Sequence, residues 1–118
     1  AGIEDSYELE ASGGEIDTRP LIRAVVEDVL RGISTDLISA KFHNAVAAAV
    51  LDVTRQIRAS EGLNRVALSG GTFQNFYLLH RTVKLLRAAG FDVLLHSTVP
   101  TNDGGLALGQ AVIASQIP

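Results

Sequence analysis

The sequence predicts an α/β fold, with a small parallel or mixed sheet packed against about four helices, in one unit that spans residues 1–118. Two short apolar segments, 65–69 and 92–96, have the length and composition of buried parallel strands. The stretch between them, 73–89, repeats apolar residues at helical spacing and ends at a glycine. A last helical pattern follows residue 105. The order strand–helix–strand–helix with short connections predicts a right-handed crossover between parallel strands.

Two long helices are predicted in the first half of the chain. Residues 1–6 are expected to be disordered or a cloning remnant, and residues 7–11 alternate in polarity as a short edge strand does. An apolar stripe over 20–33 predicts the first helix. The second helix is predicted over 34–60, after a serine that can cap it. Its centre, 45–51, is apolar on nearly every side, so we expect it to be covered on more than one side.

Composition and charge exclude several classes of protein. The 118 residues carry a net charge of −3, which disfavours binding to nucleic acid through its phosphates, because such surfaces need clustered Lys and Arg. The chain has no cysteine, which excludes disulfides, thiolate zinc sites and a thiol nucleophile. No apolar run reaches the roughly 18 residues of a membrane span, and no basic and apolar leader is present. We therefore expect a cytoplasmic protein with neither a nucleic-acid nor a membrane partner.

Two glycine pairs are the main candidates for ligand binding. Gly70 and Gly71 follow the first predicted parallel strand, and Gly104 and Gly105 open the helix after the second. Ligands of α/β sheets bind beyond the carboxyl ends of the strands, where free backbone N–H groups favour anions. Each pair alone is more typical of a tight turn than of a ligand site. Neither continues into a phosphate loop or a dinucleotide fingerprint, but two pairs at one sheet edge together indicate a ligand.

Two polar residues beside these glycines have both a functional and a structural interpretation. Asn75 lies one helical turn after Gly71, where its amide can bond a base or ribose edge or can cap its own helix. Asp103 offers an oxygen ligand to a hard cation that accompanies a nucleotide phosphate, or else caps the last helix. One carboxylate alone is not a metal site, so further ligands must come from elsewhere.

The remaining chemically active residues give weaker signals. The three histidines have no metal-binding spacing, and the serine before the first glycine pair is not in a nucleophile elbow. We therefore assign no catalytic role to His43, His80, His96 or Ser69.

Two motifs in order resemble the C-terminal end of the HypF family, the carbamoyltransferases that help to mature [NiFe]-hydrogenases. The first motif spans 66–75 and reads VALSGGTFQN, and the second spans 99–111 and reads VPTNDGGLALGQA. Residues 41–44 and 18–21 fit the same family, so the resemblance covers about 7–115. It implies the last lobe of a fold shared with actin and the sugar kinases, the ASKHA fold.

The resemblance also implies a function. A HypF-like enzyme moves a carbamoyl group from carbamoyl-adenylate, made upstream from carbamoyl phosphate and ATP, to the C-terminal cysteine thiol of the partner HypE. This chain is the expected nucleotide-binding lobe, inactive without the upstream domains of the same polypeptide. The resemblance further implies a divalent metal (Mg, Fe or Zn). One carboxylate of this chain would bind the metal, and its other ligands would be histidines from outside this chain. The residues implied are Gly70, Gly71 and Asn75 for the nucleotide, Gly104 and Gly105 for its phosphates, and Asp103 for the metal.

Two alternatives stand beside this hypothesis, together with one departure from the family. The chain can instead be a lobe of an O-carbamoyltransferase of the same fold, or a non-catalytic fragment that forms a homodimer through 45–51. Phe76 stands where relatives are expected to have a basic residue. The main hypothesis requires the turns at Ser69–Gly71 and Asp103–Gly105 to lie at one edge of the sheet.

Overall fold

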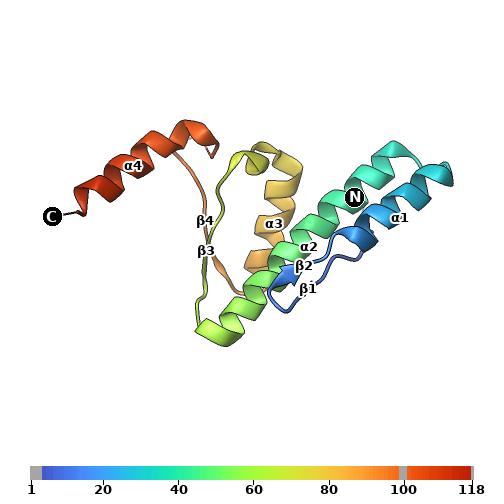
Figure 1. Cartoon of the computed structure of the whole chain (residues 1–118), viewed down its shortest axis with the longest axis horizontal. Coiled ribbons are helices and arrows are strands. Elements are labelled where there is room, and N and C mark those ends of the chain that lie inside the picture. The colour runs from blue at the N-terminus through green and yellow to red at the C-terminus, as the bar shows by residue number, and fades with distance from the viewer. Residues whose placement is uncertain (1–3, 99–100, 118) are drawn as a thin grey trace.

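The computed structural model describes residues 4–98 and 101–117 and has the predicted α/β composition (Figure 1). Its helices are α1 (Arg19–Leu30), α2 (Thr35–Glu61), α3 (Phe76–Ala88) and α4 (Leu106–Ser115). Two 3-10 turns, η1 (Gly71–Gln74) and η2 (Asp103–Gly105), precede α3 and α4. The strands form two small sheets, one of β1 (Ala11–Ser12) with β2 (Glu15–Ile16) and one of β3 (Arg65–Ala67) with β4 (Asp92–Leu94).

The strands on either side of α3 are parallel, as predicted. Arg65 pairs with Asp92, and Ala67 pairs with Leu94. The Leu68 N–H continues the pairing to the Leu94 carbonyl at 3.0 Å. Both strands therefore end at the same edge, which brings together the segments that follow them.

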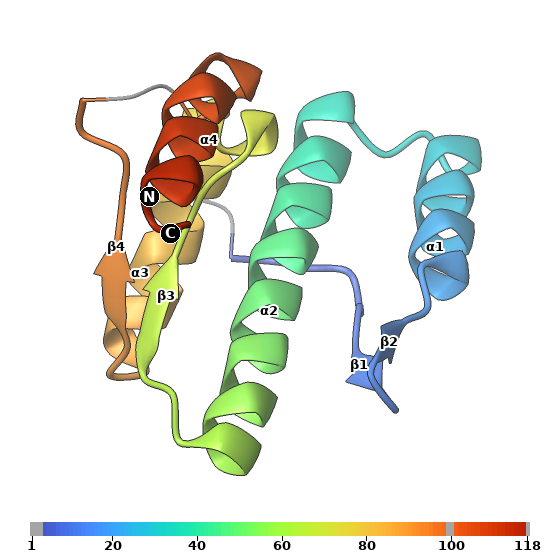
Figure 2. The same ribbon diagram turned by 60° about the vertical axis from the view of Figure 1, so that its left-hand side comes forward.

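The long helix α2 lies between α1 on one side and the layer of α3 and the parallel strands on the other (Figure 2). It is capped at its start by Ser34, whose Oγ accepts a hydrogen bond from the Leu37 N–H at 3.3 Å, and at its end by Gly62, which has a φ of +70°. Ala45, Ala47 and Ala49 are at most 4% exposed. The expected covering on more than one side is confirmed, but this chain supplies it. These three alanines are therefore not available as a surface for a second copy, whereas Ala48 in the same stretch is exposed.

The main core lies between α2, α3 and one face of the parallel pair. Its centre is Leu68, Leu86 and Phe91, each at most 5% exposed. Val66 and Val93 pack against it, whereas their neighbours along the strands point outward and are exposed. The prediction of strands buried on both faces is wrong within the described residues, because helices α2 and α3 both pack against the same face and the other is open.

The predicted edge strand over 7–11 is also wrong for most of its length. Tyr7 is buried against Leu21 and Ala45, and this packing outweighs the alternating pattern of its neighbours. Pairing begins only at β1, and the turn to β2 uses two glycines at positive φ. Upstream, the Asp5 carbonyl accepts a hydrogen bond from the Asn44 side chain at 2.8 Å. Residues 1–3 lie outside the described part.

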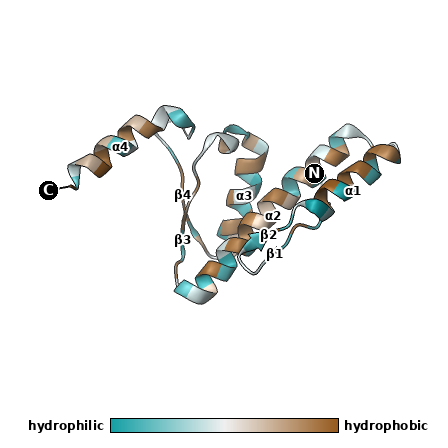
Figure 3. Cartoon of the chain, in the orientation of Figure 1, coloured by the Kyte–Doolittle hydropathy of each residue, from teal (hydrophilic) through white to brown (hydrophobic). Residues whose placement is uncertain are grey.

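Helix α4 extends away from the rest of the molecule (Figure 1). The radius of gyration is 16.7 Å, against about 13.5 Å for a compact domain of this length. Apolar residues, brown in Figure 3, run along α1 and α4, and many of them are exposed. In the apolar stripe of α1, Ile22, Val26 and Val29 are each at least half exposed. No helix in the described residues combines the length and the apolar character needed to cross a bilayer.

Candidate functional site

The two glycine turns meet, as the main hypothesis requires. The Gly70 N–H donates to the Thr101 carbonyl at 2.7 Å. A Cβ added at Gly71 would lie 3.9 Å from the Asn102 Cβ. Around this contact is a hollow of about 310 Å³, lined by residues of both turns and of α4. The parallel strands produce this convergence, because each turn follows the carboxyl end of one of them.

Gly70 fixes the geometry of the first turn. Its φ of +97° and ψ of 158° form a conformation that is almost confined to glycine. The chain turns there from β3 into η1, and the Gly70 carbonyl accepts the Phe73 N–H at 3.2 Å. No heavy atom lies within 4 Å of a Cβ added at Gly70, so the requirement comes from the backbone and not from space.

The backbone N–H groups at the site divide into two sets. The second turn uses its own glycine N–H groups, since Gly104 donates to the Asn102 Oδ1 at 2.9 Å and Gly105 to the Asn102 carbonyl at 3.0 Å. By contrast, the N–H groups of Gly71, Thr72 and Asp103 have no acceptor among the described residues. Among the described residues, the donors left for an anion are thus at the first two positions of η1 and the first position of η2.

Asp103 lines the hollow and does not cap its helix. Asn102 is the capping side chain of η2, and α4 begins without a side-chain cap, so the interpretation of Asp103 as the cap of the last helix is wrong. Within residues 4–98 and 101–117 no three His, Cys, Asp or Glu side chains gather as a metal site would require. The chain therefore offers a cation one carboxylate beside two turns, as a partial donor set.

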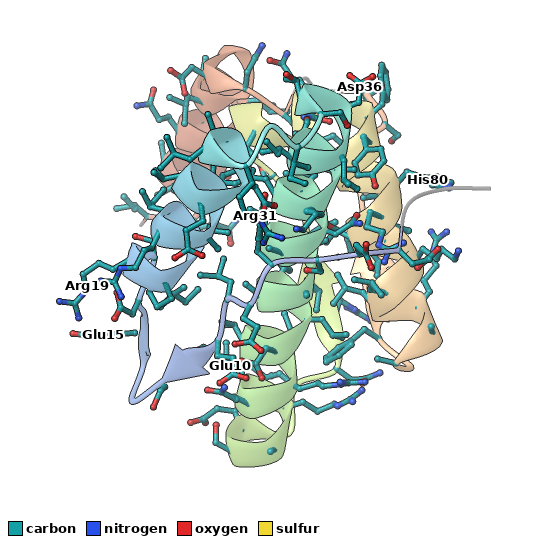
Figure 4. All side chains as sticks on the ribbon, turned by 90° about the vertical axis from the view of Figure 1, so that its right-hand side faces the viewer. Glu10, Glu15, Arg19, Arg31, Asp36 and His80 are labelled. Carbon is teal, nitrogen blue, oxygen red and sulfur yellow. The ribbon has the colours of Figure 1, made fainter. Side chains whose placement is uncertain are left out.

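Asn75 lies apart from the glycine hollow, at the other end of η1. Its Oδ1 accepts a hydrogen bond from the Leu78 N–H at 3.1 Å, which confirms the capping interpretation. Its Nδ2 donates to His43 Nε2 at 2.8 Å. It lines a second hollow of about 390 Å³ together with residues of α2 and α3, among them Asp36 in the first turn of α2, which is labelled in Figure 4. Capping uses one lone pair, so it leaves part of the amide for a ligand.

Two histidines that the sequence left without a role are at these hollows. His43 contacts Asn75 in the second hollow, and His96 Nε2 lies 2.8 Å from the Ser69 Oγ in the first. His96 follows β4 as Ser69 follows β3, so the shared strand edge was the signal that could have paired them. Phe76, which stands where relatives are expected to have a basic residue, lies at the start of α3 and is 84% exposed.

A family model described as carbamoyltransferase, Kae1-like domain, second subdomain, matches residues 2–110. The chain belongs to the HypF carbamoyltransferase family. It is 38% identical to carbamoyltransferase HypF of Synechocystis sp. over 96% of this chain and 35% identical to that of Rhodobacter capsulatus over 92%. In each case it spans 14% of the relative's length.

Two solved HypF structures are similar to this one. A full-length HypF in a phosphate- and nucleotide-bound form superposes with a TM-score of 0.92 at 45% identity, over 98% of this chain and 16% of that one. HypF of T. kodakarensis superposes with a TM-score of 0.83 at 28% identity, over 96% of this chain and 15% of that one. The α/β arrangement described above is therefore the HypF arrangement of this segment.

Proposed function

We propose that this chain forms one wall of the nucleotide pocket of a HypF-type carbamoyltransferase. The enzyme would move a carbamoyl group from carbamoyl-adenylate to the C-terminal cysteine thiol of a HypE-like acceptor. The convergence of the turns at Gly70 and Asp103 around one hollow carries this proposal. The phosphate and nucleotide bound by a HypF of the same fold support it.

In this proposal the two turns bind the phosphate of the adenylate. The open N–H groups of Gly71, Thr72 and Asp103 are suitable donors to phosphate oxygens. The glycines beside them have no Cβ, so an anion can approach the backbone closely. Charge that develops on the leaving phosphate would be stabilised by donors that are already in place.

Asn75 would bind the base or the ribose in the second hollow. After its bonds to Leu78 and His43, its amide retains one N–H and one lone pair. This combination of donor and acceptor matches the edge of an adenine. A nucleotide is an extended molecule, so its base and its phosphate can occupy the two hollows at either end of η1.

Asp103 would supply one oxygen to a divalent cation, Mg, Fe or Zn, whose other ligands come from outside this chain. When bound, such a cation neutralises phosphate charge and polarises the carbamoyl carbonyl. The acceptor thiolate then forms the new C–S bond as the bond from the carbamoyl carbon to the adenylate oxygen breaks, and AMP leaves. The chain has no cysteine, in keeping with a nucleophile from the partner.

The test compares Asp103→Asn with Asp92→Asn in the full-length enzyme. Asp92 is an exposed residue of β4 whose carboxylate pairs with Arg65 at 3.2 Å, outside both hollows. We expect Asp103→Asn to slow carbamoylation of the acceptor thiol by about 100-fold or more, as loss of electrostatic stabilisation does. Formation of carbamoyl-adenylate, measured by pyrophosphate exchange, should be unchanged because an upstream domain performs it.

Mass spectrometry of the acceptor gives the rate and the modified atom. Wild-type rates in Asp103→Asn would contradict the role of this carboxylate. A carbamoyl group recovered on a small-molecule hydroxyl, with none on the thiol, would favour the O-carbamoyltransferase alternative.

A further inference from the structure

His43 and Asn75 are joined in a chain of hydrogen bonds that connects α2 to the start of α3. The Leu78 N–H donates to Asn75 Oδ1 at 3.1 Å, and Asn75 Nδ2 lies 2.8 Å from His43 Nε2. On the other side of the imidazole, His43 Nδ1 lies 2.7 Å from the Ser39 carbonyl. The chain thus runs from one helix backbone to the other through two side chains that are 32 residues apart.

The donors and acceptors in this chain have one consistent assignment. A carbonyl oxygen only accepts, so His43 Nδ1 carries the proton that is donated to Ser39. In the neutral imidazole Nε2 then carries a lone pair, which accepts the Asn75 N–H. The bond from the Leu78 N–H independently identifies the other end of the amide as oxygen. The tautomer of His43 and the orientation of Asn75 therefore determine one another.

The imidazole ring is itself held in place. It makes edge-to-face contacts with Tyr77, at a centroid distance of 5.6 Å, and with Phe42, at 6.1 Å. The Tyr77 hydroxyl donates to Asn44 Oδ1 at 2.8 Å, and Asn44 is only 1% exposed. The acceptor that faces Asn75 is thus braced by two partly exposed rings, one of which is anchored to the buried Asn44, and such bracing favours precise ligand positioning.

We propose that His43 is a positioning residue, which presents the Asn75 amide to the nucleotide. This inference rests on the proposed function, in which Asn75 contacts the ligand. The capping bond from the Leu78 N–H fixes only the oxygen of the Asn75 amide, so the plane of the amide group can still tilt about that oxygen. The bond to His43 fixes the nitrogen as well, so the remaining N–H and lone pair keep one orientation before the ligand arrives.

The first test uses the wild-type full-length enzyme, with asparagine and histidine labelled with ¹⁵N. We expect a protonated Nδ1 and an unprotonated Nε2 at His43, and a scalar coupling between His43 Nε2 and Asn75 Nδ2. An imidazole protonated at Nε2 alone, with no coupling, would overturn the proposal without any variant having to fold.

The second test compares three substitutions by ATP titration, followed at the Asn75 side-chain signals so that only this site is read. His43→Phe keeps the ring and its aromatic contacts but removes the acceptor, and we expect the dissociation constant to rise about fivefold, as for one lost hydrogen bond. His43→Gln restores an acceptor oxygen and should recover most of the affinity. His80→Phe, on the exposed side of α3 (Figure 4), is the matched control and should bind as the wild type does.

A fourth variant, Asn75→Ala, separates this proposal from the one on which it rests. Its ATP affinity is read at the backbone amide signals of Gly71 and Thr72, so that again only this site is followed. If Asn75→Ala weakens binding while His43→Phe binds as the wild type does, the positioning role is wrong and the nucleotide contact stands. If Asn75→Ala binds as the wild type does, both are wrong. A loss of affinity in His43→Gln with none in His43→Phe would show that the ring acts by packing alone, which also overturns the proposal.

Discussion

At the residue scale, Asp28 joins the N-terminal segment to the two long helices. One oxygen of this buried carboxylate accepts hydrogen bonds from the Lys41 Nζ and from the Tyr7 hydroxyl, each at 2.7 Å. The Lys41 Nζ also lies 4.3 Å from the centre of the Tyr7 ring. The bond from Lys41, and then that from Tyr7, lower the pKa of Asp28. Burial, with a further contribution from Asp28, raises the pKa of Tyr7 to about 12.

These shifts predict opposite losses of stability in acid and in alkali. The pKa of Asp28 is lowered in the folded state, so its contribution is present above the unfolded value and is lost as pH falls through the folded one. The pKa of Tyr7 is raised, so its contribution is present below 10.0 and is lost as pH rises from there towards about 12. The loss of stability in alkali is therefore caused by ionisation of the Tyr7 phenol on unfolding.

Tyr7→Phe tests the alkaline half of this argument. We expect it to lower the free energy of unfolding by about 2 kcal/mol at pH 7, the cost of a lost hydrogen bond to a charged group. At pH 11 the gap between the wild type and the variant should narrow, because only the wild type has a phenol to ionise on unfolding. Urea unfolding at both pH values measures the gap, and a gap of constant size would contradict the assignment.

At the element scale, α3 packs on α2 through a stripe with one polar member. Leu78, Thr82 and Leu86 follow at intervals of four residues and are at most 4% exposed. The Thr82 Oγ1 is buried and has no hydrogen-bond partner among the described residues. A buried hydroxyl without a partner costs stability, so the interface is less stable than its shape allows.

Thr82→Val should therefore stabilise the protein. Valine has nearly the same shape and the same branching, so the packing is kept while the unpaired hydroxyl is removed. We expect the free energy of unfolding to rise by about 1 kcal/mol. Thr82→Ser, which keeps the hydroxyl and loses the methyl group, should lower it by a similar amount. A valine variant less stable than the wild type in urea would mean that the hydroxyl is bonded, for example to water.

The elements that the sequence predicted are those whose signals are local. Ser34 and Gly62 cap the ends of α2, and short apolar segments on either side of one helix were sufficient for the parallel pair. The convergence of the two glycine turns followed from that pairing alone. The start of α3 was predicted too early, because the capping role of Asn75 competes with helical periodicity on either side of it.

What could not be predicted depends on contacts between distant elements. Tyr7 is buried because Asp28 and Lys41 meet it, and no pattern of neighbouring residues encodes that meeting. The bond between His43 and Asn75 requires the relative position of two helices, so spacing rules for histidines could not find it. The open face of α1 resembles a buried one in sequence, because periodicity shows that a face is apolar but not what covers it.

At the scale of the whole molecule, the chain exposes more surface than a protein of its size normally does. Its accessible surface is 8207 Å², against about 6,200 Å² for a compact monomer of its mass. The difference is larger than one partner's share of a standard protein interface. Helix α4 contributes a group of apolar side chains that are each more than half exposed, namely Leu106, Leu108, Val112 and Ile113.

We expect the remainder of the enzyme to cover this surface, since the chain spans 14–16% of the length of its HypF relatives. Covering four such side chains stabilises a helix by several kcal/mol, because each contributes about 1.5 kcal/mol or more when buried. Hydrogen exchange at the α4 amides should therefore be at least about 100-fold slower in the full-length enzyme than in this 118-residue chain. The central amides of α2, which this chain already covers, should change far less and are the internal control. If the α4 amides exchange equally fast in both proteins, the rest of the enzyme does not cover this helix.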